Sequence, residues 1–463
     1  MKIMKRLIVL SAVLLGFVCR AEVEKPPQRI FSETEEQRNA RLAWWTDARF
    51  GMFIHFGLYS MPARHEWVKT FERIPETEYD EYFKRFDPDL FDAKQWARQA
   101  KASGMRYAIL TAKHHEGFCL FDTKYSDYKI TNTPFKRDLV REFVDAFRAE
   151  GIRVGFYYSL LDWHHGDFTI DRCHPLRNLG KEKIAELNAT RDMAKYRQYM
   201  KDQITELMTQ YGKIDIVWYD FSYPGKNGKG RDDWDSPGIV SLTRKLQPGI
   251  IIDNRLDLND CKGGVDFVTP EQVRVTQQPT FNGKPYAWEA CHTFSGSWGY
   301  YRDEASWKSA VQCIDLLVGC VAHNGNLIMN VGPTARGVFD SRATERMNDY
   351  AKWMRFNSRS IYGCGAPPEG FKTPEGTHLT YNKKTNRLYV HLFTYPFKTL
   401  ILDFGDKIDY AQFLHDGSEL KIRLMSEWEC SHLGIPSDSR PMVVELPVVK
   451  PDVSVPVVEL YLK

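Results

Sequence analysis

Short apolar runs alternate with helical patterns between about residue 30 and residue 365. Runs typical of strands occur at Phe50–Phe56, Arg106–Ala112, Ile152–Ser159, Lys213–Asp220, Gly249–Asn254, Asp266–Val268 and Asn326–Asn330. Helical patterns lie between them at Asp92–Ser103, Asp138–Glu150, Thr190–Gln210 and Trp307–Ala322. Strands that are separated by helices pair in parallel. Because the unit recurs many times, the pattern predicts an α/β fold with a (β/α)8-like barrel rather than an open sheet.

The pattern changes after Tyr362. Residues 363–376 are rich in glycine and proline, a composition typical of a linker. Alternating runs without an intervening helix follow, at Arg387–Phe393, Thr399–Asp403 and Val453–Leu462. They predict a small C-terminal β-sandwich domain. We therefore expect the barrel to occupy residues 22–365 and the sandwich to occupy residues 366–463.

The first residues resemble an export signal. Lys2, Lys5 and Arg6 precede the mostly apolar run Leu7–Cys19, and the small residue Ala21 follows. This order is typical of a secretory signal peptide, here residues 1–21. The run is shorter than the roughly 20 apolar residues that cross a bilayer. The sequence thus predicts a periplasmic or secreted protein without a membrane span.

Composition narrows the function classes. The 463 residues are 43% hydrophobic and 27% charged, close to globular averages, which excludes a disordered, collagen-like or polytopic membrane protein. With 63 basic and 60 acidic residues the net charge is only +3, so nucleic acid is not an expected partner. The 12 Trp and 23 Tyr suit a pocket that stacks on sugars, although a large core uses aromatic rings too. Eight cysteines follow residue 21 without CxxC spacing, so we expect buried free thiols. None of these features defines an oligomeric state.

Polar and aromatic residues follow the predicted strands at their carboxyl ends, where a barrel carries its chemistry. Asp220 comes after a strongly apolar strand, and Glu271 comes after a short strand and Pro270. A pair of carboxylates at a mouth rich in rings is suited to glycoside hydrolysis, although two ion-paired structural acids would look the same. Glu289 is a second candidate for the partner of Asp220, and we expect it within a longer excursion between strands.

Histidines raise the alternative of a metal-dependent barrel hydrolase. His114 and His115 are adjacent, and neighbours on a strand point to opposite faces, so they are poor joint ligands unless the strand has ended. The sequence has no HExxH motif, which argues against a hydrolytic metal site. It also lacks the glycine-rich nucleotide loops and the GxSxG elbow. We therefore predict no metal and no cofactor.

An ordered set of motifs resembles glycoside hydrolase family 29, the α-L-fucosidases. The motifs are FGMFIHFGLYS (50–60), TAKHHEGF (111–118), YYSLLDW (157–163), IVWYD (216–220), DFVTPE (266–271), SWGY (297–300) and GNLIMNVGP (325–333). The resemblance covers roughly residues 30–365. It implies an exo-enzyme that removes terminal α-L-fucose with retention and without a cofactor, followed by a C-terminal β-sandwich. A fucosylated oligosaccharide or glycoconjugate is the expected substrate.

The resemblance also assigns roles to residues. Asp220 matches the nucleophile, Glu271 matches the general acid/base, and Phe53 matches an apolar wall for the fucose methyl group. The expected substrate-binding residues are His55, Glu66, Trp67, His114, His115, Tyr157, Trp218 and Arg255. A non-catalytic barrel that binds fucosylated glycans is a further alternative, but the presence of both acids counts against it.

Overall fold

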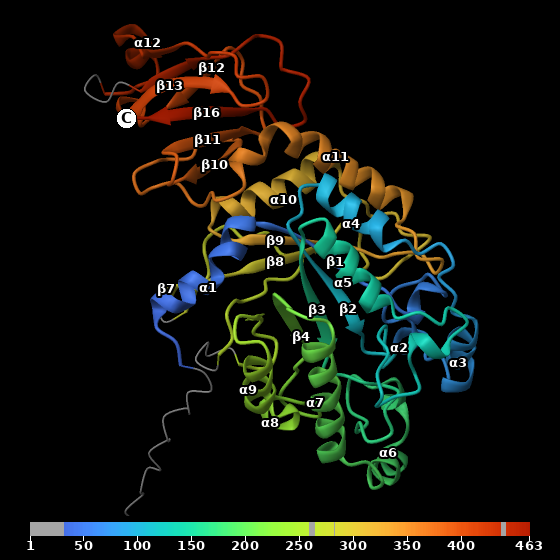
Figure 1. The fold of residues 1–463 in the computed structure, drawn as a ribbon. Coiled ribbons are helices and arrows are strands. Elements are labelled where there is room, and N and C mark those ends of the chain that lie inside the picture. Colours follow the sequence, from blue (N-terminus) through green and yellow to red (C-terminus); the bar gives the residue numbers. More distant parts are fainter. Residues whose placement is uncertain (1–31, 259–263, 282, 437–440) are drawn as a thin grey trace, which may run out of the picture.

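A curled sheet of seven parallel strands forms the centre of the larger part of the molecule (Figure 1). The computed structural model describes residues 32–258, 264–281, 283–436 and 441–463. The strand order is β5-β4-β3-β2-β1-β9-β8, and all neighbours are parallel. The strands are β1 (Phe50–Ile54), β2 (Tyr107–Lys113), β3 (Arg153–Ser159), β4 (Ile216–Asp220), β5 (Ile251–Ile252), β8 (Glu289–Thr293) and β9 (Asn326–Val331).

Residues 266–271 fill the gap between the two edge strands. Parallel bridges connect Asp253 to Phe267 after β5, Val268 to Trp288 before β8, and Glu271 to Cys291 within β8. The segment thus takes the eighth position and closes the sheet on itself. The predicted (β/α)8-like barrel is confirmed. A two-stranded hairpin, β6 (Thr280–Phe281) and β7 (Lys284–Pro285), lies in the connection to β8.

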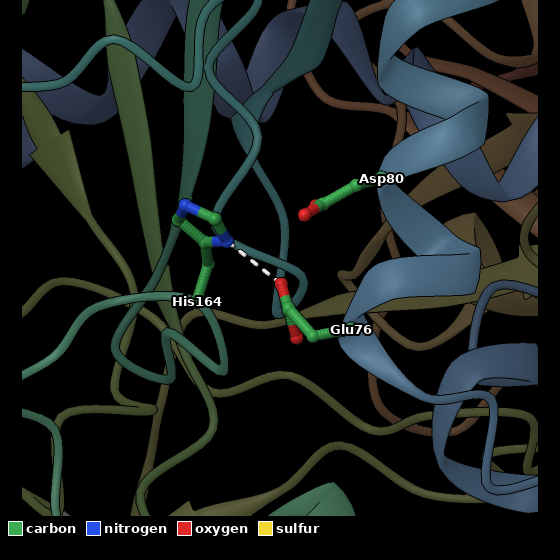
Figure 2. Close-up of side chains that lie close together, drawn as sticks. All are labelled: Glu76, Asp80 and His164. Carbon is green, nitrogen blue, oxygen red and sulfur yellow. Dashed lines mark hydrogen bonds and ion pairs between the residues drawn. The ribbon is translucent and has the colours of Figure 1, made fainter.

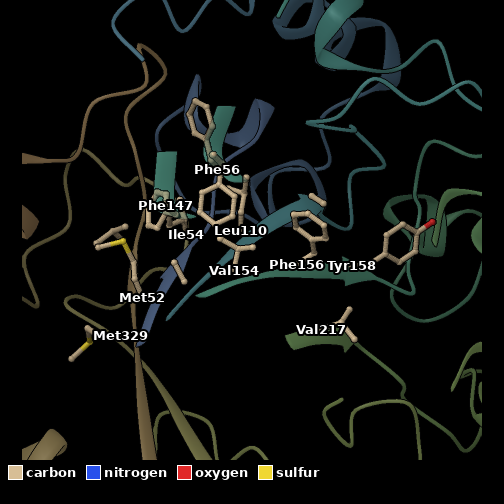
Figure 3. Close-up of a cluster of buried hydrophobic side chains, with 14 of the residues drawn as sticks. Met52, Ile54, Phe56, Leu110, Phe147, Val154, Phe156, Tyr158, Val217 and Met329 are labelled. Atoms are coloured by element: carbon tan, nitrogen blue, oxygen red, sulfur yellow. The ribbon is translucent and has the colours of Figure 1, made fainter. Parts of the chain in front are cut away.

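Helices cover the outside of the barrel. Side-chain caps define where several of them begin, and apolar faces of the helices pack against the strands. Asp92 Oδ1 accepts hydrogen bonds from the backbone N–H groups of Lys94 and Gln95 at the start of α4 (Ala93–Ala102). Phe147 of α5 (Leu139–Ala149) belongs to the same buried cluster as Val154 of β3 (Figure 3). Six helices that follow or connect the strands are α4 (Ala93–Ala102), α5 (Leu139–Ala149), α7 (Met193–Gln210), α9 (Ser236–Leu246), α10 (Ala310–Ala322) and α11 (Ser341–Asn357). The other barrel helices are α1 (Glu35–Ala48), α2 (Val68–Phe71), α3 (Glu76–Arg85), α6 (Lys181–Asn188) and α8 (Arg231–Trp234).

Helix α1 closes the amino-terminal end of the barrel. Its Trp45 is buried and packs on Phe267, with ring centroids 4.9 Å apart. The Trp45 carbonyl accepts a hydrogen bond of 2.8 Å from Asn326, the first residue of β9. The opposite, carboxyl-terminal end is therefore the one left open for a ligand.

The C-terminal part is a β-sandwich, as predicted. A four-stranded antiparallel sheet, β10-β11-β16-β13, faces a three-stranded one, β12-β15-β14, and both contribute to one apolar core. The strands are β10 (Thr377–Asn382), β11 (Arg387–Leu392), β12 (Thr399–Leu402), β13 (Ile408–Phe413), β14 (Ile422–Leu424), β15 (Met442–Glu445) and β16 (Val457–Leu462). The expectation of no helix in this region is wrong: α12 (Glu427–His432) forms because Ser426 and Glu429 make a capping box.

The sandwich rests on the helices of the barrel. Its β10 and β11 lie beside α10 and α11 (Figure 1). Trp353 of α11 donates an indole hydrogen bond of 2.9 Å to the Val455 carbonyl. The described cysteines are unpaired and all but Cys173 are buried, so the expectation of free thiols is confirmed for that part of the chain. Within the described residues no helix has both the length and the apolar character needed to cross a bilayer. The predicted signal peptide lies outside the described residues.

Candidate active site

One pocket at the carboxyl-terminal end of the barrel collects the predicted catalytic and substrate-binding side chains. Its lining consists of Phe53, His55, Glu66, Trp67, His114, His115, Tyr157, Trp218, Asp220, Phe221, Arg255, Glu271, Cys291 and Trp298. Parallel strands end at the same edge, so residues far apart in sequence meet there. Phe221, Cys291 and Trp298 were missed by the sequence analysis, although Trp298 lies in the SWGY motif.

Two carboxylates in the pocket share one guanidinium nitrogen. Arg255 Nη1 lies 3.0 Å from Asp220 Oδ1 and 2.8 Å from Glu271 Oε2. These two oxygens can therefore be no farther apart than about 5.8 Å, the sum of the two contacts. Retaining glycosidases place their carboxyl groups about 5–5.5 Å apart, whereas inverting enzymes leave about 6.5–9.5 Å for a water molecule. The spacing favours the retaining arrangement.

Asp220 is buried yet held in its ionised form. Its Oδ2 accepts a hydrogen bond of 2.7 Å from the Tyr157 hydroxyl, and its Oδ1 accepts one from Arg255. Burial acts to raise the pKa of Asp220, but the charge of Arg255 and the hydrogen bonds from Tyr157 and Arg255 outweigh it, so the pKa is lowered. Asp220 thus places an ionised carboxylate at the end of β4, which is the charge state that nucleophilic attack requires.

Arg255 is itself held from several sides. Its Nε donates to Thr269 Oγ1 at 2.8 Å, and its guanidinium carbon lies 5.1 Å from the centroid of the Trp218 ring. Its backbone N–H donates to the buried carboxyl of Asp253 at 3.1 Å. Burial acts to lower the pKa of Arg255, but Asp220 and the other acidic groups raise it. Arg255 was expected to bind substrate, and the geometry shows that it also contacts both carboxylates.

His55 and His115 of the pocket are neutral and have defined tautomers. Ser159 Oγ donates to the Leu161 carbonyl at 2.8 Å, so it accepts from His115 Nδ1 at 2.7 Å. Asn330 donates its amide to the Trp298 carbonyl, so its Oδ1 accepts from His55 Nδ1 at 2.7 Å. In both rings Nε2 remains an acceptor for a sugar hydroxyl.

Burial keeps these rings uncharged. It lowers the pKa of His55 to about 4 and that of His115 to about 3, and it lowers the pKa of His114 well below its usual range. Strand β2 ends at Lys113, so His114 and His115 are not constrained to opposite faces, and their ring centroids lie 4.0 Å apart.

Glu66 holds one wall of the pocket in place. Its buried Oε2 accepts from the backbone N–H groups of Trp298 and Gly299 at 3.1 and 3.0 Å. Gly332 lets this loop approach β9, because a Cβ there would lie 2.6 Å from the Gly299 carbonyl carbon. The Trp298 ring then packs 5.0 Å from His55. The predicted sugar-binding residue Glu66 is thus also an anchor for an aromatic wall.

Phe221 follows Asp220 with an unusual backbone conformation. Its φ of 80° lies in the left-handed region, which is a genuine outlier for a bulky residue. The Phe221 ring packs on His115 at 4.8 Å and on Trp67 at 5.1 Å. The strain therefore turns an aromatic ring over the pocket next to the ionised carboxylate.

Glu289 does not lie in the pocket. The expectation that it belongs to an excursion between strands is wrong, because it is the first residue of β8. It is fully buried, and its Oε2 accepts hydrogen bonds from Trp45 Nε1 at 3.1 Å and from the Tyr107 hydroxyl. Trp45 belongs to α1, so Glu289 sits at the end of the barrel opposite Asp220, the last residue of β4.

One other cluster has the composition of a metal site. In the described part of the chain, Glu76, Asp80 and His164 bring their possible ligand atoms within 4.8 Å of one another. Figure 2 shows Glu76 and Asp80 on helix α3 beside the His164 ring. Glu76 is already paired, to His164 Nδ1 at 2.8 Å and to the buried Lys69 Nζ at 2.8 Å. Burial acts to raise the pKa of Glu76, but His164 and Lys69 lower it to about 2. The cluster balances the charge of Lys69 and lies outside the pocket lining.

Comparison with known proteins agrees with this geometry. The α-L-fucosidase family model matches residues 18–359. The chain is 29% identical to human plasma α-L-fucosidase over 359 residues, 72% of either chain. It is 26% identical to α-L-fucosidase of Dictyostelium discoideum over 402 residues, 79% of this chain and 81% of the relative.

Solved structures show the same fold. α-L-Fucosidase isoenzyme 1 from Paenibacillus thiaminolyticus superposes with a TM-score of 0.84 at 41% identity, covering 92% of this chain and 99% of that one. A family 29 α-L-fucosidase from Bacteroides thetaiotaomicron, trapped as a covalent intermediate with 2-fluoro-fucosyl fluoride, superposes with a TM-score of 0.79 at 26% identity, covering 95% and 100%. The chain therefore belongs to the α-L-fucosidase family of glycoside hydrolases, family 29.

Proposed function

We propose that this protein is a retaining exo-α-L-fucosidase in which Asp220 is the nucleophile and Glu271 is the general acid/base. The observation that carries the proposal is the pair of carboxylates that share Arg255 within one aromatic pocket. Facing oxygens within about 5.8 Å of each other fit direct attack on the sugar better than an inverting mechanism, in which the carboxyl groups stand about 6.5–9.5 Å apart.

The reaction proceeds in two displacements. Glu271 donates a proton to the glycosidic oxygen while Asp220 attacks the anomeric carbon, so the glycosidic bond breaks and a covalent fucosyl ester forms. Glu271 then takes a proton from water, the resulting hydroxide attacks the anomeric carbon, and Asp220 leaves as a carboxylate. Arg255 holds Asp220 ionised between turnovers. The neutral His55 and His115 accept hydrogen bonds from sugar hydroxyls through Nε2.

The shape of the pocket supports action on a terminal sugar. Phe53 and Trp218 are both buried, and their ring centroids lie 5.1 Å apart inside the barrel. These rings close the inner end, so a glycan cannot extend through the pocket. Phe53 also offers an apolar contact for the methyl group that distinguishes L-fucose from L-galactose.

Product stereochemistry tests the proposal. Purified protein is given 4-nitrophenyl α-L-fucoside, and the NMR signals of the released sugar are followed in time. We expect α-L-fucose first, no loss of activity with EDTA, and no turnover by Asp220→Ala. β-Fucose as the first product would refute the covalent mechanism, and loss of activity with EDTA would favour a metal-dependent hydrolase. Binding of fucosylated glycans without turnover would favour the non-catalytic alternative.

We also propose that the protein is exported to the periplasm or the medium after cleavage near residue 21. The basic residues Lys2, Lys5 and Arg6 and the apolar run that follows support this. Amino-terminal sequencing of the protein recovered from the periplasm or medium of the expressing cell tests it. A mature protein that begins at Met1 would contradict export by this signal.

A further inference from the structure

An open groove of about 840 Å³ adjoins the pocket. Its lining includes residues that also line the pocket, among them Trp67, Trp298 and Glu271. It extends outward past His65, Phe71 and Trp307. A ligand that fills the pocket can therefore continue into this groove without leaving the protein surface.

The position of the two carboxylates selects this groove for the leaving group. In a double displacement the nucleophile and the leaving group occupy opposite faces of the sugar, and the general acid stands beside the leaving oxygen. Glu271 lines this groove and also a second groove of about 640 Å³, but Asp220 lines only the second one. The second groove therefore opens on the side of the nucleophile, which is the wrong face for the leaving group. The sugar released from fucose therefore faces the groove that contains Phe71.

Phe71 gives that groove a flat apolar surface. It is the last residue of α2 and is 62% exposed, unusual for so large an apolar side chain. Its ring stacks on Trp67, with centroids 5.9 Å apart and planes 25° apart, and lies 5.2 Å from His65. Trp67 in turn packs on His115 at the pocket. A continuous row of rings thus runs from the pocket to the outer groove.

We propose that Phe71, supported by Trp67 and His65, is the stacking platform for the pyranose ring to which the fucose is attached. The apolar C–H face of a pyranose can lie flat on an aromatic ring. Such a ring stabilises the bound sugar through the apolar area that it buries and through the stacking geometry. The inference rests on the proposed function, because it uses the roles of Asp220 and Glu271 to define the side of the leaving group. Phe71 then determines which aglycones are hydrolysed efficiently and leaves recognition of fucose unchanged.

Two substrates separate this role from catalysis. α-L-Fucosyl fluoride has no sugar in the groove, whereas a fucosyl disaccharide does. The disaccharide is taken from an α1,2-, α1,3- and α1,6-linked panel as the one that the wild-type protein hydrolyses best. We expect Phe71→Ala to lower kcat/KM for the disaccharide by about five- to twentyfold, mainly through KM, and to leave the fluoride unchanged. Phe71→Trp should restore the disaccharide activity.

A matched control is Phe397→Ala, since Phe397 is 73% exposed on the sandwich. Phe397→Ala should have the same kcat/KM as wild type for both substrates. Equal losses on the fluoride and the disaccharide in Phe71→Ala, or no loss on either, would overturn the proposal. If the wild-type protein hydrolyses neither substrate, the proposed function itself fails. If the protein hydrolyses both substrates and Phe71→Ala has the same disaccharide kinetics as wild type, the proposed function stands and only the role of Phe71 is refuted.

Discussion

Replacement of Glu289 by glutamine removes a titratable group from the closed end of the barrel while preserving side-chain size. Glu289 has no exposed surface, and its Oε2 accepts hydrogen bonds from Trp45 and Tyr107. Burial raises the pKa of Glu289 to about 7, although Tyr107 and Trp45 act in the opposite direction. The folded protein therefore keeps this carboxyl protonated at acidic pH, whereas the unfolded chain ionises it.

The size of the effect follows from the pKa shift. The ordinary pKa of a glutamate is 4.5, so folding raises it by about 2.5 units. One unit corresponds to about 1.4 kcal/mol, so about 3 kcal/mol is at stake. Because the folded pKa is raised, the stabilising contribution is fully present below pH 4.5 and is lost as the pH rises through 7. Glutamine has no such titration. The stability of Glu289→Gln relative to wild type should therefore grow by about 3 kcal/mol between pH 4.5 and pH 8.

Urea unfolding at pH 4.5, 6 and 8 measures this difference. All other titrating groups are shared by the two proteins, so they cancel in the comparison. The exposed Glu369→Gln serves as a control, because its side chain meets water in both states. A stability difference between Glu289→Gln and wild type that stays constant across this pH range would refute the reasoning, since it would mean that Glu289 is already ionised in the folded protein.

The same variant separates the two candidate acids. Glu289 lies at the end of the barrel away from Asp220, so Glu289→Gln should retain turnover of fucosides at neutral pH and should not respond to azide. A large loss of activity that azide restores would show that Glu289 is the acid/base and that the assignment of Glu271 is wrong.

Two further predictions concern the chemistry of the pocket. Glu271→Ala should lower turnover of natural fucosides by about 10²- to 10⁴-fold. With an aryl fucoside whose phenol is strongly acidic, Glu271→Ala should release a burst of phenol before slow hydrolysis, and added azide should restore turnover and give fucosyl azide. If azide does not raise the turnover of Glu271→Ala, Glu271 is a binding residue and not the acid/base. Phe53 should give a preference for fucosides over L-galactosides of about 10- to 200-fold in kcat/KM, because apolar pockets discriminate one small group by about 1–3 kcal/mol. Equal kcat/KM on 4-nitrophenyl fucoside and L-galactoside would refute enclosure of the methyl group.

Local sequence pattern predicts the barrel and the sandwich, and the family motifs add most of the pocket. Apolar runs such as Ile216–Asp220 reveal buried strands because a parallel barrel strand is covered on both faces. The carboxyl ends of parallel strands meet at one edge, so His55, Asp220 and Arg255 could be placed together from their positions after strands. This inference uses only local pattern and the topology that it implies.

Local pattern does not show which end of the barrel Glu289 occupies or what Arg255 contacts. Strand β8 reads Glu-Ala-Cys-His-Thr and has little apolar signal, so its start at Glu289 and the inward position of Cys291 were not visible. Trp298 enters the pocket because Glu66, more than two hundred residues earlier, binds its backbone N–H. Hydrogen bonds between such distant segments depend on how the closed sheet folds back on itself, and no local pattern along the chain encodes them.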